Sequence, residues 1–320
     1  MVFEGYNISI RGKSHDTNGK PCQDSSYYYA NDNYAVAVVS DGHGSSKYYR
    51  SDIGSKLAVE AVFAVVSSCM GTGYKDFIEG IKNDSRTIMN RMTDAVLTEW
   101  TDLVKKYDSG RPLSEQERKL EDSDDRQDIL RAYGATLICG VMSDDIVFGF
   151  QIGDGEFVAV NDESEDTMPM PEDPDCFLNR TSSICSSDAS GRFRHLVISE
   201  YVRNIESDSF RAICCNPEKV SSVIVCTDGL STSFNSDESL MRYCTAIPDA
   251  LSSGNKGILE ENLKLRSCSN TCDDVSVSVV YRMKPGLVNI PVTYAGKDKR
   301  RQNRKNRKNK QKRKDRRHRG

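Results

Sequence analysis

The stretch Tyr34–Gly44, YAVAVVSDGHG, joins a short apolar run to an aspartate, two glycines and a histidine. Its first seven residues, up to Ser40, are small, β-branched and almost wholly apolar, which is typical of a buried strand. The run continues directly into Asp41 and Gly42, and a glycine lets the backbone turn sharply and approach a ligand closely. The stretch therefore predicts a buried strand that carries a carboxylate at its end.

The same arrangement, an apolar run that meets an acid at one end, recurs three more times. The further runs are short and rich in β-branched residues, and one of them alternates apolar with polar residues as a half-buried strand does. Carboxylates at the ends of several strands can converge in space although they are far apart in the sequence. The three runs are SVIVCT (222–227) before Asp228, IVFGFQI (146–152) before Gly153-Asp154-Gly155, and VSVSVVY (275–281) after Asp273 and Asp274.

These acids indicate a metal site. Oxygen donors without Cys or His at ligand spacing suit hard divalent ions, Mg²⁺ or Mn²⁺, better than zinc. Each Asp-Gly pair taken alone is explained as well by an ordinary turn. A set of them favours a metal, because clustered carboxylates repel and raise one another's pKa unless a cation neutralises them. The candidates are Asp24, which closes Pro-Cys-Gln-Asp, and Asp41, Asp228 and Asp273.

Six short motifs, taken in chain order, resemble the motif series of the metal-dependent type 2C (PPM) protein phosphatases. Any one of them is weak, and their agreement in order makes the resemblance specific over roughly residues 1–283. The local sequence around His15 and Lys20 is most similar to that of the bacterial-type branch of the family. The six motifs are Gln23-Asp24, Asp41-Gly42-His43-Gly44, Gly134-Ala135-Thr136, Gly153-Asp154-Gly155, Thr227-Asp228-Gly229 and Asp273-Asp274-Val275-Ser276.

For the fold, the resemblance implies an α+β protein built as a four-layer αββα sandwich. Two mostly antiparallel β-sheets would be flanked by helices, with the metals at one end of the sandwich. From the periodicity alone, a doubly wound sheet would fit equally well. The spacing of apolar residues predicts amphipathic helices over residues 51–66 and 74–106, with Trp100 in the core beneath them.

The resemblance implies a site for two Mn²⁺ or Mg²⁺ ions, with a position for a third. Asp41 would bridge the two ions, and the carbonyl oxygen of Gly42 would complete the second. Asp154 corresponds to the family position that can recruit a third, weaker ion, although Thr232 stands where some relatives have a further acid. The terminal ligands would be Asp24, Asp228 and Asp273, with Asp274 behind them at a position where relatives often have Asn.

His43 corresponds to the histidine that protonates the leaving alkoxide in the family. A histidine with an unperturbed pKa of about 6.5 can supply that proton, and its place two residues after Asp41 puts it on the rim of the site. By itself it would be an ordinary loop histidine. With the motif around it, His43 and Asp41 are the predicted catalytic residues.

The substrate phosphate must be bound differently from the way many eukaryotic relatives bind it, with an arginine where this chain has Gly19. A bidentate guanidinium is therefore absent from that position. His15 is the first candidate to replace it, because it belongs to the wording shared with the bacterial-type branch, although a role unrelated to substrate remains open. The other candidates are Arg11, Lys13, Lys20 or the metal ions alone.

The function expected from the motifs is that of a metal-dependent serine/threonine phosphoprotein phosphatase. It would hydrolyse phosphomonoesters with a water activated by two metal ions. Two other functions remain open. The chain could be a phosphatase-like regulatory or binding module with weak catalysis, and the glycine at position 19 favours this alternative. It could also be a protein that binds polyanions such as nucleic acid through its basic tail.

The chain of 320 residues divides by composition. Residues 1–285 are expected to form the phosphatase domain, with polar insertions near 107–131 and 161–192, followed by a linker at 286–296. Residues 297–320, the basic tail, carry a net charge of about +13, which leaves about −16 for the rest because the whole chain carries −3. Almost without apolar residues, the tail is expected to be disordered alone and to bind polyanions, among them the protein's own acidic face.

Composition further indicates an intracellular enzyme. The most apolar stretch, residues 57–66, contains Glu60 and is too short to cross a membrane, and the N-terminal residues lack the features of a signal peptide. The 11 cysteines are odd in number and several lie in predicted strands, which favours reduced thiols over a disulfide framework. The chain is therefore expected in the cytoplasm, as a monomer without structural zinc or a transmembrane segment.

Overall fold

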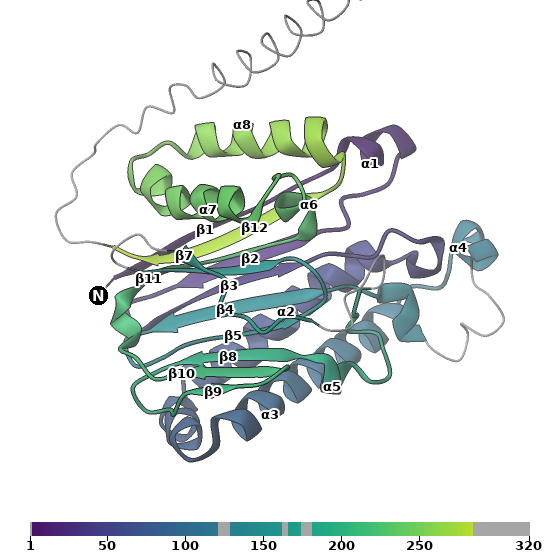
Figure 1. Ribbon diagram of the computed structural model, residues 1–320. Helices are drawn as coiled ribbons and strands as arrows, with labels where there is room; N and C mark the ends of the chain where they lie inside the picture. Colours follow the sequence, from purple (N-terminus) through teal and green to yellow (C-terminus); the bar gives the residue numbers. More distant parts are fainter. Residues whose placement is uncertain (1, 121–128, 162–165, 174–180, 284–320) are drawn as a thin grey trace, which may run out of the picture.

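The apolar runs of the sequence form the strands of two β-sheets that pack face to face (Figure 1). The computed structural model describes residues 2–120, 129–161, 166–173 and 181–283. A layer of helices covers the outer face of each sheet, so the predicted four-layer αββα sandwich is confirmed. The linker, the basic tail and parts of both predicted insertions, namely residues 121–128, 162–165 and 174–180, lie outside the described residues.

The first sheet has five strands in the order β1-β12-β11-β6-β7, and its neighbouring pairs are antiparallel. These strands are β1 (Phe3–Ile10), β6 (Glu156–Asn161), β7 (Asp166–Thr167), β11 (Val220–Cys226) and β12 (Val275–Arg282). The second sheet has seven strands in the order β2-β3-β4-β5-β8-β10-β9, in which β8 and β10 pair in parallel and the others antiparallel. These strands are β2 (Ser25–Ala30), β3 (Tyr34–Ser40), β4 (Leu137–Ser143), β5 (Val147–Ile152), β8 (Arg194–Ile198), β9 (Ile205–Glu206) and β10 (Phe210–Ile213).

β3 shows why a continuous apolar run is needed at the centre of the sandwich, because the strand is buried on both faces. Ala35, Ala37 and Val39 belong to the core between the two sheets. Val36 and Val38 belong to the core between the seven-stranded sheet and its helices. Neither face of the strand can therefore carry polar side chains until its end, where the acids begin.

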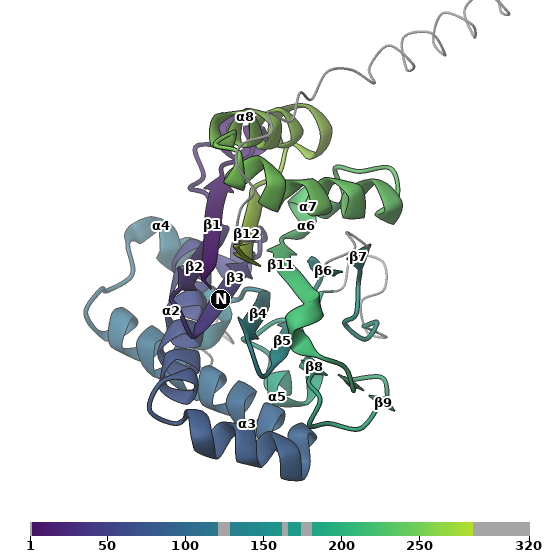
Figure 2. The ribbon, with the colours of Figure 1, turned by 90° about the vertical axis from the view of Figure 1, so that its left-hand side faces the viewer.

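Helices α2 (Ser51–Met70) and α3 (Tyr74–Ser109) cover the seven-stranded sheet (Figures 1 and 2). They confirm the predicted helices at 51–66 and 74–106, the second of which has a kink at Asp84, where φ is −154° and ψ is 84°. Trp100 is buried, and its Nε1 donates to the carbonyl oxygen of Gly54 at 3.1 Å, so its predicted place in the core is confirmed. Helices α7 (Asp237–Ser252) and α8 (Lys256–Arg266) cover the five-stranded sheet.

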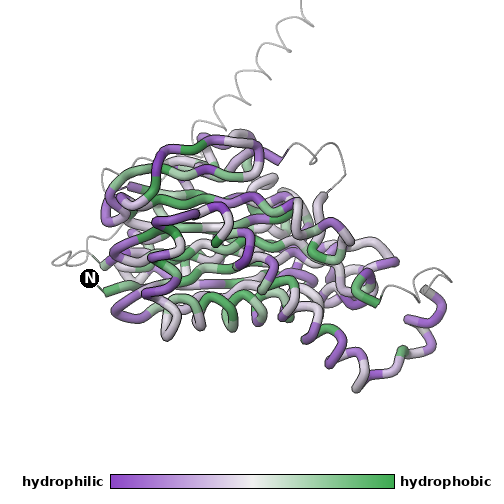
Figure 3. The backbone as a smooth tube through the Cα atoms, turned by 90° about the horizontal axis from the view of Figure 1, so that it is seen from below, coloured by the Kyte–Doolittle hydropathy of each residue, from purple (hydrophilic) through white to green (hydrophobic). Residues whose placement is uncertain are grey.

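Short helices lie in the connections between these elements. One of them, α4, belongs to the predicted insertion at 107–131, and its Glu117 accepts a hydrogen bond from Nε of the buried Arg50 at 2.6 Å. Figure 3 shows apolar residues concentrated along the strands, with hydrophilic residues on the outer loops and helices. The short helices are α1 (Lys13–Asn18), α4 (Glu115–Leu120), α5 (Ala189–Arg192) and α6 (Asp228–Ser231).

Among the described residues, α2 is the one helix long and apolar enough to cross a membrane by length and composition. In the structure its residues Ala58, Ala61, Val62 and Val66 are fully buried in the core shared with the seven-stranded sheet and α3. The core helix of a globular domain passes the same test. The helix is therefore weak evidence for a membrane segment.

His195, on β8, makes the stability of this core depend on pH. Its side chain is buried near the rings of Phe193 and Phe210, and its Nε2 lies 3.2 Å from Thr93 Oγ1. Burial lowers its pKa from 6.5 to about 4. Because the unfolded chain binds this proton more readily, the free energy of unfolding should fall as the pH drops from 6.5 toward 4. We expect a loss of up to roughly 3 kcal/mol.

Denaturant unfolding of the wild type and of His195→Phe across this pH range measures the effect. The variant keeps an aromatic ring, and Thr93 retains its hydrogen bonds to the carbonyl oxygens of Met89 and Asn90. Its free energy of unfolding should therefore depend less steeply on pH than that of the wild type. Equal slopes for the two proteins would contradict the prediction.

Candidate metal centre

Strand pairing brings the predicted acids to one end of the sandwich. Asp24 precedes β2 and Asp41 follows β3, and the pairing of Ser25 with Ser40 brings these two ends together. The end of β11, the start of β12 and the turn between β5 and β6 lie at the same end. These three positions carry Asp228, the pair Asp273 and Asp274, and Asp154.

Two of the acids have raised pKa values because they are buried and lie close to other carboxylates. Asp24 is buried, and its pKa is raised to about 8, first by burial and then by the charges of Asp274 and Asp228, against a hydrogen bond from Thr227. The pKa of Asp41 is raised well above its ordinary value by burial, by the charges of Asp24 and Asp228, and by a hydrogen bond with Asp228. Without a cation, these carboxylates therefore tend to hold protons.

Asp228 connects two further acids to this pair. Burial raises its pKa, and the charges of Asp154 and Asp273 raise it further. Asp154 stands in a tight turn between two glycines with φ of +97° and +88°, a conformation that side chains disfavour. Five acids thus act on one another: Asp24, Asp41, Asp154, Asp228 and Asp273.

The loop after β3 is fixed by backbone contacts that explain its glycine. A Cβ atom at Gly42 would lie 2.6 Å from the carbonyl oxygen of Gln23 and 2.7 Å from that of Ser51, so only glycine fits. Thr136 holds Asp41 twice: its Oγ1 accepts from the Asp41 N–H at 3.1 Å, and its own N–H donates to the Asp41 carbonyl at 2.8 Å. The Gly134-Ala135-Thr136 motif therefore positions this loop.

The two acids before β12 have different surroundings. Asp274 is buried, and its two carboxylate oxygens accept hydrogen bonds from the N–H groups of Gly12 and Gln23, each at 2.6 Å. Asp273 is exposed, and its Oδ1 accepts from the N–H of Asp274 at 2.9 Å. Asp274 thus joins the segment before β2 to β12. The charge of Asp273, in contrast, raises the pKa of Asp228.

The two residues predicted to bind phosphate lie at α1, and both are engaged by the protein itself. Nδ1 of His15 is 2.9 Å from Oδ1 of Asp274, a close contact without the alignment of a hydrogen bond. Nη2 of Arg11 donates to the His15 carbonyl at 2.9 Å, and its Nε lies 3.2 Å from Oδ1 of Asp16. His15 therefore meets the same carboxylate that holds Gly12 and Gln23.

His43 lies in the loop that carries Asp41, with its ring centre 4.6 Å from that of Tyr48. Its N–H donates to the carbonyl oxygen of Gly134 at 3.1 Å. Burial lowers its pKa to about 4, and the charge of Asp154 acts in the opposite direction. The imidazole of the protein without ions or substrate is therefore neutral at neutral pH.

The donor set fits a hard divalent cation, although it is not closed around one. Within the described residues, no three His, Cys, Asp or Glu side chains are gathered closely enough to hold an ion as they stand. Asp41 and Asp228 instead share a hydrogen bond. Carboxylates with raised pKa values, beside a loop that leaves room only for a glycine at Gly42, are oxygen donors of the kind that Mg²⁺ and Mn²⁺ prefer.

Three residues near the acids were not assigned a role from the sequence. Thr227 Oγ1 donates to Oδ2 of Asp24 at 2.8 Å, so it joins the end of β11 to the segment before β2. Thr181 Oγ1 donates to Oδ2 of Asp154 at 2.5 Å. Burial raises the pKa of Glu156, at the start of β6, to about 7. Of the three, only Thr227 stands in a motif that the sequence displays.

Comparison with known families and structures identifies this fold. The family model described as Protein phosphatase 2C matches residues 11–265, well over half of the chain. The chain belongs to the protein phosphatase 2C family. The six motifs therefore predicted the family correctly, although the matched range ends before Asp273. No match was found among curated proteins.

Three solved structures similar to this protein phosphatase 2C chain come from bacteria. The serine/threonine phosphatase PstP/Ppp of Mycobacterium tuberculosis is 16% identical, with a TM-score of 0.50 over 89% of this chain and 100% of that one. The serine/threonine phosphatase of S. agalactiae is 15% identical, with a TM-score of 0.50 over 88% and 100%. PppA of Pseudomonas aeruginosa, a regulatory component of T6SS, is 13% identical, with a TM-score of 0.50 over 88% and 99%. At such identities the likeness shows the fold alone.

In this protein phosphatase 2C chain, Asp24→Asn should separate metal binding from folding. Burial and two other acids make ionisation of Asp24 unfavourable in the folded chain, whereas the amide is neutral in both states. At neutral pH the metal-free variant should therefore be more stable than the wild type by on the order of 1–3 kcal/mol. We expect Mn²⁺ to raise the Tm of the wild type, and this rise should largely disappear in the variant, because a ligand that binds more weakly stabilises the folded state less. Thermal unfolding with EDTA and with Mn²⁺ measures both effects.

The control for this prediction is Asp208→Asn, a change to an exposed acid in the turn between β9 and β10. It should leave both melting temperatures close to those of the wild type. A shift with Mn²⁺ that is as large in Asp24→Asn as in the wild type would show that the ion binds elsewhere.

Proposed function

We propose that the chain is a metal-dependent serine/threonine phosphoprotein phosphatase that hydrolyses phosphomonoesters. The observation that carries this function is the group of five mutually repelling acids at one end of a protein phosphatase 2C fold. Such a group destabilises the folded chain unless cations neutralise it. The serine/threonine phosphatases of similar fold support the same reaction.

The roles proposed for the acids are those that the family resemblance implies, and the charges acting between them support these roles. Asp41 would bridge two Mn²⁺ or Mg²⁺ ions, because the charges of both Asp24 and Asp228 act on it, and the Gly42 carbonyl would complete the second ion. When bound, the ions supply Lewis acidity at the phosphoryl oxygens and make the attacking water more acidic. The terminal ligands would be Asp24, Asp228 and Asp273, with Asp154 available for a third ion.

The chain's own residues hold these acids in place and move one proton. Asp274 ties Gly12 and Gln23 to β12, and thereby fixes the position of Asp24 beside them. His43 would donate a proton to the oxygen of the leaving serine or threonine. It must be protonated to do so, and a phosphate dianion bound beside it would raise its pKa from the low value that burial gives.

His15 is the first candidate to bind the phosphate group of the substrate. With its Nδ1 at Asp274, this imidazole has Nε2 left for a substrate oxygen. Arg11 is the second candidate, and it would have to give up its contact with Asp16 to reach a phosphate.

The test is release of phosphate from a phosphoserine peptide by the full chain. Turnover that requires Mn²⁺ or Mg²⁺ and stops with EDTA supports the proposed function. Binding of the peptide without turnover, with every ion tried, would favour the second candidate, a phosphatase-like regulatory module. The observation that favours that module is Gly19, which stands where many relatives have a phosphate-binding arginine.

We further propose that the chain is a cytoplasmic monomer, that its basic tail binds nucleic acid or other polyanions, and that the domain ends at residue 285 and the linker at residue 296. Cell fractionation, light scattering, a gel-shift assay with RNA and limited proteolysis would test them in turn.

A further inference from the structure

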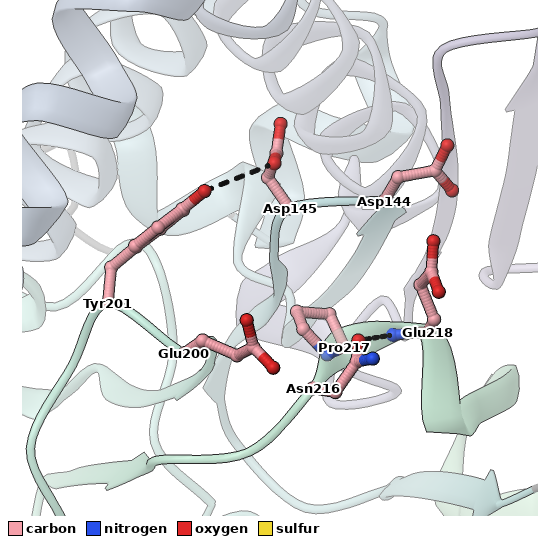
Figure 4. Close-up of a pocket in the computed structure, with 7 residues that line it drawn as sticks. All are labelled: Asp144, Asp145, Glu200, Tyr201, Asn216, Pro217 and Glu218. Atoms are coloured by element: carbon pink, nitrogen blue, oxygen red, sulfur yellow. Dashed lines mark hydrogen bonds between the residues drawn. The ribbon is translucent and has the colours of Figure 1, made fainter.

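Figure 4 shows a pocket beside the start of β5. The metal centre lies beyond the other end of this strand, so the pocket is at the opposite end of the sandwich. It has a volume of about 250 Å³ and is formed by three connections: the turn between β4 and β5, the loop after β8, and the segment before β11. β5 runs from this pocket to the metal centre, and its six residues separate the two sites by about 20 Å. The lining residues are Asp144, Asp145, Glu200, Tyr201, Asn216, Pro217 and Glu218.

Four of the seven lining residues are acids, and three of these, Asp145, Glu200 and Glu218, have no cationic partner among the described residues. Asp145 accepts a hydrogen bond from the hydroxyl group of Tyr201 at 3.5 Å. Glu200 and Glu218 are exposed, and neither makes an ion pair with any described residue. The pocket therefore presents uncompensated negative charge beside an aromatic ring.

The same corner already binds one basic side chain of this chain. Arg282, the last residue of β12, is buried, and its Nη1 contacts Oδ1 of Asp144 at 2.5 Å. Its Nη2 donates to the Ser143 carbonyl at 2.6 Å, and its Nε donates to the Val220 carbonyl at 3.1 Å. The carbonyl groups and the acid at this end of the two sheets thus form a binding place for a guanidinium.

The chain leaves the described structure at this corner. The N–H of Met283 donates to the carbonyl oxygen of Val2 at 2.9 Å, and residues 284–320 follow. The basic tail begins 14 residues further on, a stretch that spans at most about 50 Å when extended. A tethered segment has an effective concentration on the order of millimolar near its attachment point.

We propose that the basic tail, residues 297–320, docks on its own chain in the acidic pocket, with lysine and arginine side chains against Glu200 and Glu218. Charge complementarity supports this occupant, because the tail carries about +13 and the rest of the chain about −16. Tyr201 offers a ring for a cationic group, as it already does for Lys82, whose Nζ lies 4.2 Å from the ring centre.

The metal centre is the competing acidic target, and it is the less favourable one. Asp24 is buried and out of reach of a lysine side chain, and the acids of this group would be neutralised by the ions proposed above. Docking at the opposite end leaves that site open, so it does not depend on the proposed catalysis and should not inhibit it. Its loss and the loss of phosphatase activity are therefore separately measurable.

Carbodiimide cross-linking of the full chain, which joins lysines to nearby carboxylates, tests the proposal when the joined peptides are identified by mass spectrometry. At low salt, lysines of the tail should join mainly to Glu200 and Glu218. The yield of these links should not depend on protein concentration, and it should fall at about 0.5 M NaCl, which screens exposed charges beyond roughly 5 Å.

Trypsin accessibility provides the second measurement and the matched control. In Glu200→Gln/Glu218→Gln, cleavage within the tail at low salt should be about fivefold faster than in the wild type. The control, Glu60→Gln/Glu261→Gln, changes two exposed acids on α2 and α8 and should cleave as the wild type does. All the changes are at the surface, and circular dichroism would show that the variants fold.

Three results would overturn the proposal. One is cleavage of the tail at the same rate in the pocket variant and the wild type. Another is cross-linking spread evenly over the acids of the molecule or directed to the metal centre. The third is a yield that rises with protein concentration, which would show that the tail binds a second copy of the chain.

Discussion

Asp41→Asn is expected to lower kcat/KM for a phosphoserine peptide by about 10³-fold or more in the presence of Mn²⁺. Asp41 is the acid on which the charges of Asp24 and Asp228 both act, so its replacement should weaken the binding of both proposed ions at once. The amide keeps the shape of the side chain, and the backbone contacts of residue 41 with Thr136 do not involve the carboxylate. The loop should therefore keep its conformation while the chemistry is lost. Initial rates of phosphate release at saturating Mn²⁺ measure the change.

The matched control is Asp32→Asn, in the exposed turn between β2 and β3 at the other end of the same strand. It also converts an aspartate to an amide, and it should retain the activity of the wild type. Activity of Asp41→Asn within about tenfold of the wild type would remove Asp41 from the proposed centre. Loss of activity with loss of folded structure would be recognised by circular dichroism, and Asp228→Asn would then be the second variant.

Much of the fold could be predicted because its strands are buried on both faces. A strand such as β3, between a second sheet and a helix layer, must be apolar throughout, and the run from Tyr34 to Ser40 has the limits of the observed strand. The long helices could also be predicted, because apolar residues recur at helical spacing along the side of α3 that faces the core. The pairing of strands could not be predicted from the residues, because residues as distant as Ile10 and Val275 become neighbours only in the folded chain. The family resemblance supplied the architecture of two mostly antiparallel sheets, and the pairing of individual strands came only from the structure.

The residues of the candidate site could be predicted from the sequence where a side chain able to bind a metal stands beside a residue that permits a sharp turn. An acid followed by glycine at a strand end, as at Asp41 and Asp228, is visible in the sequence. The contacts that hold such acids were hidden, because they depend on tertiary neighbours. Thr227, for example, donates to Asp24 from 203 positions away, and the buried Asp274 is distinguished from the exposed Asp273 only by the chain that covers it.

The acids of the centre also make the metal-free chain less stable than its core would allow. Asp24 carries a pKa of about 8 because ionisation in that place is unfavourable. Among the described residues, no lysine or arginine is among the groups that mainly set the pKa values of Asp24 and Asp41, and His43 is neutral at neutral pH. A group of acids that is unfavourable alone, and that bound ions would neutralise, has the property required of a metal centre, in which binding energy and folding energy are linked.

His43→Gln should separate substrates by the quality of their leaving group. A serine alkoxide leaves poorly unless it is protonated, so the variant should lose about 10²- to 10⁴-fold in kcat on a phosphoserine peptide. p-Nitrophenolate leaves without a proton, and hydrolysis of p-nitrophenyl phosphate should fall by less than about tenfold. A residue that only shaped the loop would slow both substrates alike. The ratio of the two effects, measured at saturating Mn²⁺, therefore reports proton donation itself.

Tyr48→Phe is the control for the packing of the loop, because the ring of Tyr48 lies against that of His43 and would be retained. It should hydrolyse both substrates at nearly the wild-type rate. Equal losses on the two substrates in His43→Gln would contradict the role of proton donor, whatever their size. A selective loss would also explain how a histidine that burial keeps neutral in the free protein can act as an acid. It would place the proton on His43 only when the substrate's negative charge is beside it.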